Sequence, residues 1–241
     1  MATPQENAKN IATNKKNIYA LEKAVMANKT QAYLNRSMSM VNQHMIMRNR
    51  EAAFGGNRQL ANANTDNIFA NKRGILHALP EDTDVKKNFK NAMLNKAKLE
   101  FLDHRSATNK EVVSINGDIQ AVNEAMKNVN KRIMELNEVI VTKNAGWIAT
   151  NKDWLDNGVP GADDCTPESN AKIVAANAAK IAEVKARAEA NAAQIAENRK
   201  KILVRRDGIE ANTKDIYARR ERIEANAENI KKNAERVAAL F

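Results

Sequence analysis

Residues 209–233 read IEANTKDIYARRERIEANAENIKKN, and this stretch decides the fold. An isoleucine recurs every seven residues, and an asparagine follows three residues after most of them. Residues three and seven apart lie on one side of an α-helix. The stretch therefore predicts a long helix that presents alternating apolar and amide layers to another helix.

The same repeat runs through the whole C-terminal third. Counting by sevens from Val174 to Val237 gives ten apolar residues, and counting from Asn170 to Asn233 gives seven asparagines in ten positions. We label the apolar positions a and the asparagine positions d of a heptad. The chain contains 33 asparagines in 241 residues. Because the asparagine amide competes for backbone hydrogen bonds and disfavours helices, such an excess requires a positional reason.

The N-terminal third repeats this heptad pattern. Its a positions include Ile11, Ile18, Val25 and Ile46, and its d positions include Asn7, Asn14, Asn28, Asn35, Asn42 and Asn49. At Gly55-Gly56 the count slips by one residue, and it resumes at Asn57. A slip of one residue at paired glycines predicts a local accommodation within a continuing helix.

The middle third carries an ordinary apolar stripe in place of asparagine layers. It consists of Val112, Ile115, Ile119, Val122, Met126, Val129, Ile133, Leu136 and Ile140. Two segments interrupt the helical pattern, LPEDTD at 79–84 and NGVPGADDCTPES at 157–169. Both contain the proline, glycine and capping residues that end one helix and start the next.

These observations predict an all-α fold: an elongated up-down-up three-helix bundle with Ile/Asn heptad layers like those of a coiled coil. We expect helices at about 5–79, 82–156 and 169–240, a loop at 157–168, and a single elongated helical domain over 1–241. Three helices of nearly equal length, each roughly 110 Å long, suit such a bundle, with the first and third helices parallel.

The asparagines of the last helix are candidates for buried polar layers, above all Asn198, Asn212, Asn226 and Asn233. A buried amide without a partner costs about 1–3 kcal/mol, so each must bond another amide, a backbone carbonyl, water or an ion. A slip of one heptad is harmless, whereas a smaller slip places amides against methyl groups. The asparagines therefore favour one register at the expense of stability.

The Ile-then-Asn pattern, sharpest in EANTKDI at 210–216, resembles the polar d layers in the stalks of trimeric autotransporter adhesins and phage fibres. The likeness is one of motif. It covers the seams of residues 5–75 and 170–237 and leaves out the middle helix. The resemblance implies that asparagine layers at Asn198, Asn212 and Asn226 could hold an anion; ordered water between paired amides is the alternative.

Composition argues against an enzyme. Aromatic residues make up 4% of the chain, with 8 glycines and 4 prolines, which disfavours a sandwich, a barrel or a compact catalytic domain. Cys165 is the only cysteine, so the chain has neither an internal disulfide nor a multi-cysteine zinc site. Metal-ligand spacing is missing among His44, His77 and His104, and among Asp163, Asp164 and Glu168. We expect no catalytic residue, no cofactor and no metal.

Several apolar residues are candidate assembly contacts. The cluster Met38, Met40, Met45 and Met47 suits core filling, a contact surface or a soft copper-binding strip. Trp147 and Trp154, one heptad apart, would form either a plug that closes the bundle or a docking patch for a neighbour. The C-terminal Phe241 ends an apolar segment that would either fray or pack into a groove of another subunit.

The net charge is +10, and it is unevenly spread: +6 over 1–50, +3 over 51–110, −5 over 111–168 and +6 over 169–241. An acidic stretch between basic ends would either hold subunits together or simply be solvated. A basic stripe on the last helix, Arg205, Arg206, Arg219, Arg220 and Arg222, would suit nucleic acid. However, Glu221, Glu224 and Glu228 are interleaved with it as intrahelical partners.

The first residues show no secretory signal, and no apolar run is long enough to span a bilayer. By default we expect a cytoplasmic protein, with leaderless export and packaging in a virus particle as alternatives. We therefore expect a structural, self-assembling helical rod, a homo-oligomer or polymer that forms a filament, sheath or lattice through lateral or end-to-end contacts. One alternative is a trimeric stalk or spacer. The other is a basic helical protein that coats nucleic acid or an anionic surface.

Overall fold

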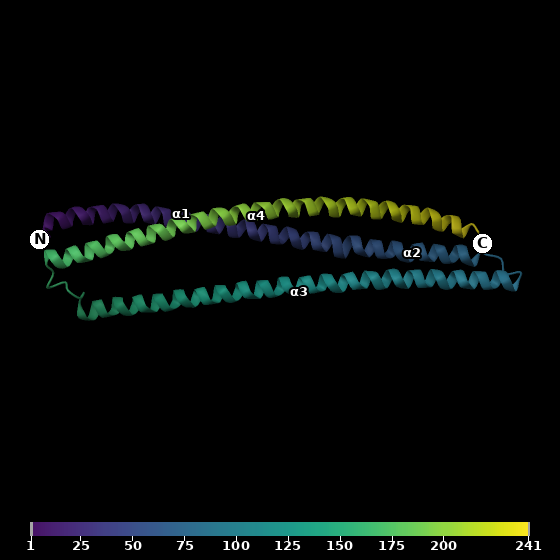
Figure 1. Ribbon diagram of the computed structural model, residues 1–241, viewed down its shortest axis with the longest axis horizontal. Helices are drawn as coiled ribbons and strands as arrows, with labels where there is room; N and C mark the ends of the chain where they lie inside the picture. Colours follow the sequence, from purple (N-terminus) through teal and green to yellow (C-terminus); the bar gives the residue numbers. More distant parts are fainter. Residues whose placement is uncertain (1, 241) are drawn as a thin grey trace. The chain divides into compact units, whose positions relative to one another are not determined.

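The computed structural model describes residues 2–240 of the chain. Helix α1 (Pro4–Glu51) continues through a π-helical turn η1 (Ala52–Asn57) into α2 (Arg58–His77), and α3 (Asp84–Asn157) and α4 (Pro167–Ala238) follow (Figure 1). Residues 2–240 contain no strand. The predicted all-α class is confirmed, and each of the three long helices begins and ends within two residues of its predicted bounds.

The helix starts are set by capping residues that the sequence supplies. The Thr3 hydroxyl accepts a hydrogen bond from the backbone N–H of Glu6, and the Glu6 carboxylate accepts one from the backbone N–H of Thr3. Thr83 accepts from the backbone N–H of Lys86 at the start of α3, and Thr166 caps α4 in the same way. Each cap satisfies a backbone donor that the first helical turn leaves unpaired.

The π turn at Gly55-Gly56 absorbs one extra residue. Asn49 and Asn57 are eight residues apart, whereas the α4 residues that they contact, Ile209 and Ile216, are seven apart. A π turn holds one more residue than an α turn, so the asparagines after it return to the same side of the helix. The predicted accommodation within a continuing helix is confirmed.

The chain divides into two compact units. The first comprises Met1–Asn64 with Asp163–Glu228, and the second comprises Thr65–Ala162 with Asn229–Phe241. The expected single domain stays a prediction. In the first unit, α1 and α4 lie side by side and run in the same direction (Figure 1).

In the second unit, α2 packs antiparallel to α3. The rings of Phe69 and Phe101 meet edge to face with their centroids 5.1 Å apart, and Arg105 pairs with Asp66. The end of α4 runs parallel to α2 (Figure 1), and Asn71 Nδ2 donates to the carbonyl of Ile230 between them. This unit therefore has the predicted up-down-up order.

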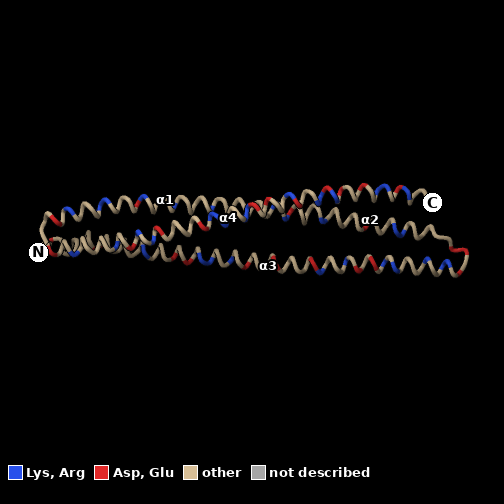
Figure 2. The backbone as a smooth tube through the Cα atoms, turned by 45° about the horizontal axis from the view of Figure 1, so that its top comes forward, with Lys and Arg blue, Asp and Glu red and all other residues tan. Residues whose placement is uncertain are grey.

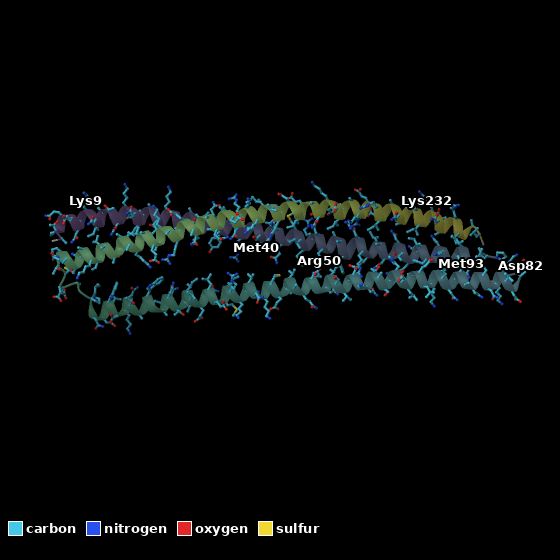
Figure 3. The ribbon with its side chains drawn as sticks, in the orientation of Figure 1. Lys9, Met40, Arg50, Asp82, Met93 and Lys232 are labelled. Atoms are coloured by element: carbon cyan, nitrogen blue, oxygen red, sulfur yellow. The ribbon has the colours of Figure 1, made fainter. Side chains whose placement is uncertain are left out.

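Two contacts in the second unit each depend on the residue type at a single position. At Gly74 the approach of α4 is so close that an added Cβ would lie 2.6 Å from Val237 Cγ1. At the turn that contains Asp82 (Figure 3), the buried Lys90 Nζ donates to the carbonyl of His77 at 2.8 Å and pairs with Glu81. Lys90 thereby satisfies a carbonyl that the C-terminus of α2 would leave unpaired.

Candidate assembly surfaces

A ladder of side-chain hydrogen bonds joins α1 to α4. In the first unit, eight asparagines donate through Nδ2 to carbonyls of α4 at 2.7–3.1 Å. The donors are Asn7, Asn14, Asn28, Asn35, Asn42, Asn49, Asn57 and Asn64. The acceptors lie seven residues apart from Pro167 to Ile223, except that Ile181 is skipped where Leu21 replaces an asparagine, and apart from Pro167 they occupy the a positions of α4. The hydrogen bonds between α1 and α4 therefore follow the spacing of the asparagines in α1.

The two helices use different sides in this ladder. Helix α1 presents its d positions, flanked by small residues such as Ala20, Ala24 and Ala27, which line a groove against α4. Helix α4 presents its a positions, flanked by Ala178, Ala182 and Ala192. We call the d side of a helix its asparagine face and the a side its isoleucine face. The asparagine face of α1 thus packs on the isoleucine face of α4, in which Val174, Ala188 and Ile209 are buried.

The amide oxygens are less completely paired than the amide nitrogens. Oδ1 of Asn35, Asn42 and Asn57 is buried without a hydrogen-bond partner. Asn49 differs, because its Oδ1 accepts from the hydroxyl of Thr213 at 2.9 Å. Thr213 stands four residues after Ile209, the acceptor of Asn49. Four residues after the acceptors of Asn35, Asn42 and Asn57, the sequence has an arginine in each case. The ladder therefore fixes register at the cost of partly unsatisfied amides.

The predicted polar layers of α4 are not buried in the single chain. Asn198, Asn212, Asn226 and Asn233 are all exposed. The asparagines buried in the single chain are Asn7, Asn35, Asn42, Asn57 and Asn64, which precede α3. Burial of the α4 asparagines in an assembly stays a prediction. The amides of the buried asparagines bond carbonyls and do not converge on one another. A signal was present in the sequence, because Leu21 is the only interruption in the first d row, whereas Val184, Arg205 and Arg219 all interrupt the second.

The isoleucine face of α1 is exposed and apolar. Ile11, Ile18, Val25 and Ile46 are each 44–51% exposed, whereas Val174 and Ile209 at the same heptad position of α4 are 8% exposed. A second apolar row follows one residue later in the heptad and is also exposed: Tyr19, Met26, Tyr33, Met40 and Met47. The two rows lie about 100° apart round the helix, and charged residues such as Lys15, Glu22 and Lys29 stand between them. They therefore form two exposed apolar stripes, which are candidate contact surfaces.

The predicted methionine cluster is therefore divided between two environments. Met38 and Met45 are half-buried, whereas Met40 and Met47 are exposed in the second apolar row. Figure 3 labels Met40 on α1. Its role in assembly stays a prediction.

The apolar stripe of α3 is also exposed over much of its length. Val122, Met126 and Val129 are among its exposed members, and Trp147 and Trp154 further along are 65% and 45% exposed. Phe241 lies outside the described residues. A role for these residues in assembly stays a prediction.

Charges on α4 alternate along the helix (Figure 2). The predicted basic stripe contains two intrahelical ion pairs, Arg206–Glu210 and Arg220–Glu224. Glu183 accepts from Lys180, and this hydrogen bond, with the charges of Lys180 and Arg187, lowers the pKa of the Glu183 carboxyl. Exposed pairs of this kind contribute little to stability, but they neutralise part of the stripe.

Residues 2–240 contain no group of three or more histidine, cysteine or acidic side chains arranged to hold a metal ion. None of the described helices has a segment that is both long and apolar enough to cross a membrane.

No protein-family model, curated protein or solved structure matches this chain.

Proposed function

We propose that this protein is a structural subunit, a helical protein that assembles with copies of itself into a filament, sheath or lattice. The observation that carries the proposal is the asparagine ladder, which holds α1 and α4 in one register while the isoleucine face of α1 stays exposed. A helix pair that is fixed internally and apolar outside is suited to repeated side-by-side packing.

Two further observations weigh against the alternatives. The parallel Ile/Asn pairing forms within one chain, whereas a trimeric stalk would need it between chains. The arginines of α4 are interleaved with acidic partners, which reduces the positive potential that nucleic acid or an anionic surface would need.

The experiment is sedimentation and negative-stain microscopy of the purified protein across concentration, at low and at high salt. We expect ordered polymers that persist at high salt, because apolar contacts and amide–carbonyl bonds are weakly screened. A protein that stays a single chain at every concentration would contradict the proposal. A discrete trimer would favour the stalk, and steeply salt-dependent binding of DNA without self-association would favour the coating protein.

A further inference from the structure

We propose that the asparagine face of α4 in one copy packs on the isoleucine face of α1 in a second copy, parallel and in the register of the ladder inside the chain. This inference rests on the proposed function and names the contact that would carry the assembly. Its partner is a second copy of this chain. The equivalence of α1 and α4 supports this contact.

The two helices are equivalent position by position. Thr3 and Thr166 occupy the N-cap, Pro4 and Pro167 follow them, and the offset of 163 residues continues along both helices as far as the π turn. The segments QAYLNR at 31–36 and QIAENR at 194–199 share their glutamine, asparagine and arginine at this offset. A contact made by one helix can therefore be made by the other.

Each helix uses only one of its two faces inside the chain. The asparagine face of α1 is bonded, and the isoleucine face of α4 is covered. The unused faces are the complementary pair, because α4 exposes Asn191, Asn198 and Asn212 while α1 exposes Val25 and Ile46. One copy therefore offers both halves of the contact that it already makes internally.

The offset predicts the bonds between copies. Asn35 donates to the carbonyl of Ile195, and the equivalent donor and acceptor are Asn198 and Ala32. The same shift pairs Asn191 with the carbonyl of Val25, and Asn212 with the carbonyl of Ile46. Helical carbonyls have a second lone pair, so they can accept these bonds without losing those of the helix.

A hydrogen bond between side chains beside the ladder also has an equivalent between copies. Inside the chain, Arg199 Nη1 donates to Gln31 Oε1 at 3.1 Å across the two helices. The equivalent of Arg199 on α1 is Arg36, and the equivalent of Gln31 on α4 is Gln194; both are exposed. The same arginine–glutamine contact is therefore available between copies.

The geometry makes this contact propagate. At 100° per residue, the a and d rows of α1 lie about 60° apart, and the alanines that line the groove against α4, such as Ala20 and Ala24, lie beyond the d row on the side away from the a row. The contact inside the chain therefore leaves the a row accessible. A chain that joins different faces forms a heterologous contact, which yields a ring where the rotation between copies closes and an open array where it does not. Parallel helix pairs added side by side in this way would build a sheet or the wall of a sheath.

The test uses two variants, each blocking one face. The α4-blocked variant carries N191D, N198D and N212D, which remove the donors and direct a negative charge at carbonyl oxygens. The α1-blocked variant carries Met26→Glu and Tyr33→Glu. All five residues are exposed, so far-UV circular dichroism and the thermal midpoint of the unassembled chains should match those of the wild type. A charge-matched control carries N116D, N123D and N130D on exposed positions of α3.

We expect each blocked variant to raise the concentration needed for assembly on the order of a hundredfold, since several bonds are lost together. Mixed at equal concentration, the two blocked variants should form discrete dimers, because one intact contact remains between an α1-blocked copy and an α4-blocked copy. The control should assemble like the wild type.

Other outcomes overturn the inference. Assembly of the α4-blocked variant at the wild-type concentration would refute this contact while leaving the proposed function intact. Equal loss in the control would assign the effect to net charge, and a mixture without dimers would refute heterologous pairing. A wild-type protein that never assembles would refute the contact and the proposed function together.

Discussion

Deletion of Gly55 should leave the ladder intact and raise the stability of the protein. The deletion removes the extra residue of the π turn, so Asn49 and the next donor, Asn57, become seven residues apart and match Ile209 and Ile216 without a bulge. An ordinary α turn then replaces η1. A deletion in the middle of a long helix normally lowers stability. A rise in stability after deletion of Gly55 would therefore point to the restored seven-residue spacing of the ladder donors.

The expected magnitude follows from the removed residue and from a control deletion. Glycine inside a helix costs about 0.5–1 kcal/mol relative to alanine, and this cost disappears with Gly55. Deletion of the exposed Lys29 rotates the residues on one side of the cut by about 100°. If the π turn η1 persists, the three bonds before the deleted residue, those of Asn7, Asn14 and Asn28, are lost. If η1 becomes an α turn, the three bonds between the deleted residue and η1, those of Asn35, Asn42 and Asn49, are lost in their place. At about 0.5–1.5 kcal/mol each, the loss is roughly 1.5–4.5 kcal/mol.

The assay is thermal unfolding followed by circular dichroism at 222 nm, below the concentration of assembly. A change of 1 kcal/mol shifts the midpoint by about 2–4 °C in a chain of this size. We expect the midpoint to rise by about 1–4 °C after deletion of Gly55 and to fall by at least about 3 °C after deletion of Lys29. Equal losses in the two deletions would refute the assignment of the π turn as a register correction.

Three further predictions concern single contacts. Thr213→Val removes the hydroxyl that serves Asn49 Oδ1 and should lower the free energy of unfolding in urea by about 1 kcal/mol, whereas Thr213→Ser should retain most of it. Gly74→Ala places a Cβ 2.6 Å from Val237 Cγ1 and should cost about 1–3 kcal/mol in thermal unfolding; in a Val237→Ala background the same change should be neutral or stabilising, and a loss there would contradict a steric cause. The hydrogen bond and charge of Lys90 hold the pKa of the Glu81 carboxyl below its ordinary value of 4.5, so this contact stabilises the fold above pH 4.5 and is lost as the pH falls below it. The midpoint difference between wild type and Glu81→Gln should therefore be present at pH 7 and vanish in acid; a difference that grows in acid would contradict this sign.

Local chemistry made most of the helical architecture predictable. Thr83 and Thr166 set where α3 and α4 begin, because each accepts a hydrogen bond from an N–H that the first helical turn leaves unpaired. The slip at Gly55 was visible as an eight-residue interval in a row of sevens. Such features depend on residues within a few positions of one another, so a sequence reveals them directly.

The pairing of faces was decided by the tertiary structure, and the sequence carried only the indirect signal of a less interrupted asparagine row in α1. Asn35 and Asn198 occupy equivalent positions, each four residues after a glutamine and just before an arginine, yet Asn35 is buried and donates across the helix pair while Asn198 is exposed. The heptad pattern states which residues share a face of a helix, and it does so equally for α1 and α4. Which of the two helices donates depends on their rotation about their own axes, and that rotation is set only when they pack. The sequence by itself therefore determined the helices, their caps and the seven-residue repeat, while packing determined the direction of the ladder and the faces left exposed.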